Sequence, residues 1–218
     1  MPTLTGRLSK TLLVSVPSSI SPRLPSVIGL SSEARSSELT GVLDAEAQSL
    51  IWDFYKPRHT HSWNMLVLSW RALDQFDTEP DTGFEIEYLW ENFIIRLWLY
   101  RTTVRTLTKL TIVKDDAENA LEAFDGSFCI AGTHGLKAIR DMIEHFDDYA
   151  AGVGRGPAVR DKHLDPWRIH SKEHYERGDL RLDRMKSYKA ADKLRADAKT
   201  ISDKFVRWYK SKVSGSIQ

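Results

Sequence analysis

The segment Arg140–His145, which reads RDMIEH, contains the residues best suited to chemistry. Cleavage of RNA without a metal needs a base for the 2′-hydroxyl proton, an acid for the leaving 5′-oxygen, and positive charge at the phosphorane. Histidine suits both proton transfers because its unperturbed pKa lies near neutrality, and arginine suits the phosphate because it stays charged. Asp141 precedes His145 by four residues, about 40° around a helix, and can orient the imidazole. The segment therefore holds the groups that metal-independent RNA cleavage requires.

A structural interpretation of the same segment needs no chemistry. Arg140 and Glu144 are spaced as an ordinary ion pair on a helix surface, worth about 0.3–0.5 kcal/mol. Asp141 and His145 have the same spacing and can form a second pair. The spacing alone thus leaves catalysis and structure open.

The segment lies in a predicted helix that runs from Thr133 to Ala151. Thr133 is suited to be its N-cap, and the glycine-rich run 152–157 ends it,. Apolar residues recur at alternating steps of three and four, as expected of a helix face that packs on a core: Leu136, Ile139, Ile143, Phe146 and Ala150,.

The region before this helix predicts other helices. Apolar spacing indicates a first helix from Asp44 to Phe54, which Lys56-Pro57 should break, and a second apolar stretch from Trp63 to Phe76,. The segment Glu85–Leu110 is apolar around so much of its circumference that it should lie centrally in the fold or at an oligomer interface. The tryptophans on these segments are expected in the core: Trp52, Trp70, Trp90 and Trp98.

The remaining elements complete an all-α fold class, a bundle of about five helices. A short helix is expected over Ala117–Phe124, and a last one over Asp183–Lys212. Between them, Trp167–Leu182 has alternating apolar residues around Arg177-Gly178, which favours a short β-hairpin before the last helix over a further helix.

Residues 1–40 differ from the rest of the chain. Nine serines and three prolines fall between Ser15 and Ser37, and no acidic residue precedes Glu33. Such a segment buries too little apolar surface to offset the entropy of ordering, so we expect a flexible tail at 1–40 and a helical domain at 41–214. A basic, acid-poor start also fits a transit peptide.

The composition indicates a globular protein. The 218 residues are 41% hydrophobic and 28% charged, with a net charge of +1,. The single Cys129 rules out an internal disulfide and fits a reducing compartment. Because no run reaches the roughly 18 uncharged apolar residues that a membrane span needs, we expect a soluble cytoplasmic protein without a membrane partner.

The arginine followed by four residues and a histidine, with polar Asp141 directly after Arg140, resembles the R-x4–6-H motif of the HEPN family. These domains, named for higher eukaryotes and prokaryotes nucleotide binding, are helical bundles with this motif late in the bundle, and the resemblance covers roughly residues 37–212 in helix order. It implies a homodimer whose facing motifs cut RNA without metal or other cofactor, often as a toxin or defence effector with a neutralising partner protein. Carried over, Arg140 would stabilise the phosphate, His145 would act as base or acid, and Asp141 would position them.

The chain departs from the family in several respects, one of which is the negative charge that Asp147 and Asp148 place beside the motif. Members silenced by adenylylation carry a tyrosine two residues after the histidine, where this chain has Asp147. Arg140 and His145 would also lie about 140° apart on an ideal helix, which favours a site built by two chains. The competing interpretation is a catalytically silent bundle that uses its aromatic central helix as a partner surface.

Three basic residues precede the motif. Arg101, Arg105 and Lys109 fall four residues apart in the predicted central helix and form a basic ridge. They are candidates for contacts to RNA phosphates, although a solvated helix face has the same pattern.

Other patterns favour simpler interpretations. The H-x-x-E-H sequence at 170–174 matches an inverted zinc-peptidase motif, but no glutamate follows Glu176 to complete the site, so no metal site is expected,. His59 and His61 follow Pro57 and are expected in a solvated loop. Cys129 and His134 could be nucleophile and base, but the apolar neighbours of Cys129 favour a small buried residue.

Overall fold

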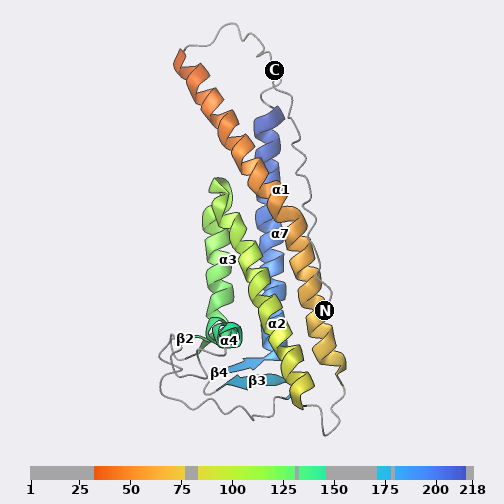
Figure 1. Ribbon diagram of the computed structural model, residues 1–218. Coiled ribbons are helices and arrows are strands. Elements are labelled where there is room, and N and C mark those ends of the chain that lie inside the picture. The colour runs from red at the N-terminus through yellow and green to blue at the C-terminus, as the bar shows by residue number, and fades with distance from the viewer. Residues whose placement is uncertain (1–31, 77–82, 131–132, 146–170, 178–179, 215–218) are drawn as a thin grey trace, which may run out of the picture.

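The computed structural model describes residues 32–76, 83–130, 133–145, 171–177 and 180–214, which form a bundle of helices with a β-hairpin at one end (Figure 1). The first helix, α1, runs without interruption from Ser32 to Gln75 and packs along α2 (Gly83–Val104). Its buried residues recur at helical spacing and include Tyr55, Trp63, Leu66 and Leu73,.

The helix break predicted at Lys56-Pro57 is wrong, because α1 passes through Pro57. A proline inside a helix removes one backbone hydrogen bond and crowds the preceding turn, at a cost of about 3 kcal/mol. Tyr55 before it and Trp63 after it are buried in the same core, so packing holds both halves of the helix in line. α1 also begins at Ser32, before the boundary predicted at residue 41, while residues 1–31 lie outside the described residues.

The helix α2 lies centrally in the bundle, as its apolar circumference predicted. Its fully buried residues include Trp90, Phe93, Ile94, Leu97 and Tyr100. The α-helix ends at Val104, short of the predicted Leu110, and two 3₁₀ turns follow at Arg105–Lys109 and Thr111–Val113.

Two short elements lead to the motif helix. α3 (Lys114–Gly126) extends the predicted short helix at both ends, and strands β1 (Cys129–Ile130) and β2 (Thr133–His134) then pair antiparallel. α4 (Gly135–Glu144) begins directly after β2. Its N-cap is His134, so the predicted cap at Thr133 is wrong, and the predicted continuation to Ala151 falls largely outside the described residues.

The β-hairpin predicted before the last helix is confirmed. Strands β3 (His174–Arg177) and β4 (Leu180–Asp183) pair antiparallel, with Tyr175 opposite Leu182. Both of these side chains are buried, so the hairpin closes the lower end of the core in Figure 1.

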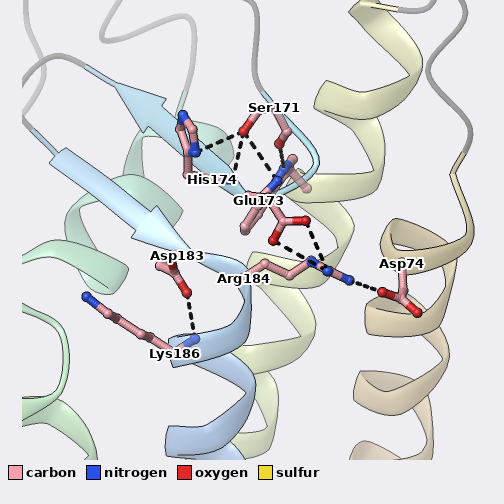
Figure 2. A network of polar contacts seen from close by, with 8 residues as sticks. Asp74, Ser171, Glu173, His174, Asp183, Arg184 and Lys186 are labelled. Atoms are coloured by element: carbon pink, nitrogen blue, oxygen red, sulfur yellow. Dashed lines mark hydrogen bonds and ion pairs between the residues drawn. The ribbon is translucent and has the colours of Figure 1, made fainter.

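Polar contacts join the hairpin to the helices on either side (Figure 2). Arg184, the first residue of α7 (Arg184–Ser214), is 5% exposed and pairs with Asp74 of α1 and with Glu173, at 3.4 Å, in the approach to β3. The Oδ1 atom of Asp183 accepts the backbone N–H of Lys186 at 2.7 Å, which caps the start of α7,.

The last helix completes the core. α7 packs against α1, α2 and α3, and its buried stripe comprises Ala191, Leu194, Ala198, Ile201 and Phe205. The predicted fold class, a mainly helical bundle with a short hairpin before its last helix, is therefore confirmed. Within the described ranges, none of the helices combines the length and apolarity needed to cross a bilayer.

Candidate functional site

Arg140 lies on α4 at the edge of the core. Its guanidinium carbon is 4.8 Å from the centroid of the Trp98 ring of α2, a cation–π contact,. Leu136 and Ile139 are fully buried and hold α4 against the bundle. The Arg140 side chain keeps 17% of its surface exposed, so it reaches solvent from a fixed position.

Two carboxylates balance the charge of Arg140. Its Nη2 atom lies 2.8 Å from Asp141 Oδ1, and its Nη1 atom donates to Glu144. The pair of Arg140 with Glu144 that the structural interpretation predicted is therefore present. The Arg140 Nε atom is buried without a hydrogen-bond partner among the described residues.

His145 stands just beyond the helix. α4 ends at Glu144, and the exposed His145 has a φ of −125° and a ψ of 41°, outside helical geometry. Because His145 is outside the helix, the angle of about 140° expected between Arg140 and His145 on an ideal helix does not apply,. The His145 backbone N–H donates to the carbonyl of Asp141 at 3.0 Å, whereas the Asp141 carboxylate pairs with Arg140 rather than orienting the imidazole.

A second polar cluster also contacts Trp98. The Arg101 guanidinium carbon is 5.0 Å from the Trp98 centroid, so this ring contacts two arginines. Arg101 binds Asp125 through two nitrogens, with Nε to Oδ1 at 2.7 Å. His134 joins the cluster because its Nε2 atom lies 3.0 Å from Asp125 Oδ1. Sequence reasoning missed this cluster, whose members are 3 to 36 residues apart in the chain and come from three different elements.

Electrostatics fix the charge state of Asp125. Burial raises the pKa of this carboxyl. Its hydrogen bonds with Arg101, together with the adjacent His134, outweigh the effect of burial and lower the pKa from 3.8 to about 2. Asp125 is therefore an anion that holds α2 and the start of α4 together.

Both ring nitrogens of His134 are engaged in structure. Nδ1 accepts the backbone N–H of Lys137 at 3.4 Å and caps α4. Nε2 is buried against Asp125, with an alignment that makes the contact electrostatic rather than a well-directed hydrogen bond. A base for Cys129 would need a reachable nitrogen, so the nucleophile interpretation of Cys129 and His134 loses its support. Cys129 is itself exposed, and its predicted burial is wrong.

The predicted basic ridge does not form along one helix face. Arg101 is half-buried and paired with Asp125, while Arg105 and Lys109 are exposed on the 3₁₀ turn. Side chains four residues apart point about 120° apart around a 3₁₀ helix, compared with about 40° around an α-helix. Arg105 and Lys109 therefore face different directions.

The remaining candidate motifs have structural roles. His59 lies on α1, so its predicted loop is wrong, and its Nε2 is 3.0 Å from Tyr100 Oη. Burial lowers the pKa of His59, and the charge of Arg195 lowers it further. His61 is two residues further along the helix, about 200° away, and cannot share a ligand with His59.

The zinc-peptidase motif is not helical where it is described. His174 lies in strand β3, and its Nδ1 atom is 2.9 Å from Ser171 Oγ, while His170 falls outside the described residues. In the part of the chain that the structure describes, no cluster of three or more His, Cys, Asp or Glu side chains has the arrangement of a metal site.

Comparison of the chain with family models, with curated proteins and with solved structures gave no match. The function is therefore inferred from the geometry around Arg140 and from the motif that resembles the HEPN family.

Proposed function

We propose that this protein is a metal-independent endoribonuclease of the HEPN type that acts as a homodimer. The proposal is supported above all by Asp141, which contacts both residues of the motif. Its carboxylate pairs with Arg140 at 2.8 Å, and its carbonyl accepts the backbone N–H of His145 at 3.0 Å. Asp141 thus contacts the guanidinium of Arg140 through its side chain and the backbone of His145 through its carbonyl.

Each residue of the motif has a role that fits its surroundings. Trp98 and the carboxylates hold Arg140 in place, and each terminal nitrogen of the guanidinium keeps a second N–H for a phosphate oxygen,. His145 is exposed, so its imidazole can reach a 2′-hydroxyl or a leaving oxygen,. Since the reaction needs a base and an acid, a second chain would supply the second histidine.

The proposal extends to the substrate and the setting. RNA is the substrate class, and the exposed Arg105 and Lys109 are candidates for contacts to its phosphates, whereas Arg101 is held by Asp125,. The resemblance also suggests a toxin or defence role in the cytoplasm, with a neutralising partner protein.

The first prediction concerns His145→Ala. Because the side chain is exposed and lies beyond the last helical residue, this change should abolish RNA cleavage and leave the thermal unfolding midpoint nearly unchanged. Cleavage of a labelled RNA in EDTA, with analysis for cyclic phosphate ends, measures the activity. His61→Ala removes another exposed histidine and should cleave like the wild type. Equal cleavage by wild type and His145→Ala would exclude the proposed site.

A catalytically silent interaction bundle is the second candidate. Asp141 and Glu144 already neutralise Arg140, and its contact with Trp98 contributes to packing. The aromatic helix α2 also presents Phe84 and Tyr88, which are 78% and 67% exposed, as a surface for a partner,. Absence of RNA cleavage by the wild type, and normal growth of cells that overproduce it, would favour this candidate.

A further inference from the structure

The outer face of α1 carries a line of exposed residues that we call the outer ridge. Its members step along the helix by four and three residues and therefore share one face: Leu50, Phe54, Pro57, His61, Asn64 and Leu68,. The three large apolar members are far more exposed than core residues: Leu50 is 72%, Phe54 58% and Leu68 56% exposed.

The outer ridge lies opposite the core-facing side of α1. On an ideal helix Leu50 is about 160° from Leu66, which is fully buried,. A shallow, open depression lies along the middle of the ridge, and the described residues that line it are all on α1: Lys56, Pro57, Thr60, His61 and Asn64. Phe54 lies on the same face, about one turn before this hollow, and the guanidinium carbon of Arg58 is 5.1 Å from the centroid of its ring,.

Charges at the two ends of the ridge have opposite sign. Glu46 lies before Leu50, and Arg71 lies after Leu68, on the same flank of the helix,. Both are exposed, and neither side chain has an ion-pair partner among the described residues. A parallel copy of α1 would place Glu46 against Glu46, whereas an antiparallel copy would place it against Arg71.

We propose that the outer ridge binds the outer ridge of a second copy of this chain, with the two α1 helices antiparallel. A two-fold axis near residue 59 sets Leu50 against Leu68 of the other copy and directs each Phe54 toward the hollow of the other copy. In such a two-fold contact both chains use the same patch, so no copy of the patch is left free to bind a third chain. The contact buries the most exposed apolar side chains in the described part of α1 and pairs both charges.

This interface is separate from the proposed ribonuclease site. The outer ridge is on α1, while Arg140 and His145 are on or next to α4, which packs on α2 and β4. The proposal therefore does not rest on the proposed function, and loss of either one leaves the other intact.

Sedimentation of the full chain at micromolar concentration tests the interface. The double variant Leu50→Asp with Leu68→Asp should halve the mass of the particle and weaken self-association about 100-fold or more, because four buried leucines per pair become charged. Met185→Asp is the matched control, an exposed apolar residue of α7 that should leave the mass unchanged. A wild type that sediments as one chain, or a double variant with unchanged mass, would overturn the proposal.

Charge reversal tests the antiparallel arrangement. Glu46→Arg and Arg71→Glu should each weaken association, because each places like charges side by side. The variant with both reversals in one chain should regain the wild-type mass, because opposite charges face each other again. Failure of the double reversal to restore association would contradict the antiparallel pairing, and circular dichroism of every variant checks that α1 stays helical.

Discussion

Trp98 contacts two arginines whose functions were predicted separately. Arg101 was expected to contact RNA and Arg140 to bind the reacting phosphate, yet both guanidinium groups lie within about 5 Å of this ring and both have carboxylate partners. A cation–π contact contributes from about 0.5 to about 2 kcal/mol. Replacing either arginine would therefore change stability and activity together, which makes the exposed His145 the cleaner probe of catalysis.

Asp125→Asn should reduce the stability of the protein in a pH-dependent way. Because the folded-state pKa of about 2 is below the ordinary 3.8, the unfolded chain takes up the proton first as the pH falls,. The stabilisation by the charged Asp125 is complete above about pH 4 and is lost as the pH falls through 2. Urea unfolding at several pH values measures the difference in free energy of unfolding between wild type and variant. This difference should be largest near neutrality.

The control for Asp125 is Asp115→Asn, an exposed carboxylate at the start of α3. The difference in free energy of unfolding between Asp115→Asn and the wild type should change much less with pH. A difference for Asp125→Asn that stays constant from neutral pH down to pH 2 would show that the carboxylate gains nothing from Arg101 and His134.

Local spacing predicted one contact of the site and missed the others. The pair of Arg140 with Glu144 follows from helix geometry because four residues make about one turn,. The contact between Arg140 and Trp98 joins residues 42 positions apart and depends on how α4 packs against α2. No local sequence pattern predicts this contact, so the cluster around Trp98 could be identified only from the structure.

At the scale of elements, Asp183 defines where the last helix begins. Its carboxylate accepts the N–H of Lys186 at 2.7 Å. Asp183→Ala should lower the free energy of unfolding by about 1 kcal/mol, whereas Asp183→Asn, which retains a capping oxygen, should cost much less. Chemical denaturation of the two variants measures the difference. Equal losses for alanine and asparagine would mean that the cap contributes little.

The elements differ in how far local rules determine them. The β3–β4 hairpin was predictable because its alternating apolar residues and the Arg177-Gly178 dipeptide in the sequence are local signals,. The continuity of α1 could not be predicted in this way, because Pro57 is a local signal for a helix break. The buried residues that keep the helix continuous act through partners distant in the chain,. The predicted N-cap was wrong for a related reason. Thr133 and His134 both pair with β1 and α4 begins at Gly135, so the last residue of the strand, His134, takes the capping position.

The whole particle combines the two proposed self-contacts. If the α1 ridge and the α4 motif each join two copies about perpendicular two-fold axes that intersect, the wild type should sediment as four chains. The ridge variant Leu50→Asp with Leu68→Asp should then sediment as two. That variant should still cleave RNA in EDTA, because its α4 contact is unchanged. Loss of cleavage in a folded ridge variant would contradict the independence of the two surfaces.

The position of α7 in the chain has a consequence for synthesis. This helix follows α1, α2 and α3 in the chain, yet all three bury apolar residues against it. Arg184 of this helix also pairs with Asp74, 110 residues earlier. A nascent chain therefore exposes the inner faces of its first helices until α7 has been synthesised, and a product that stops before α7 would be recognised by chaperones or proteases.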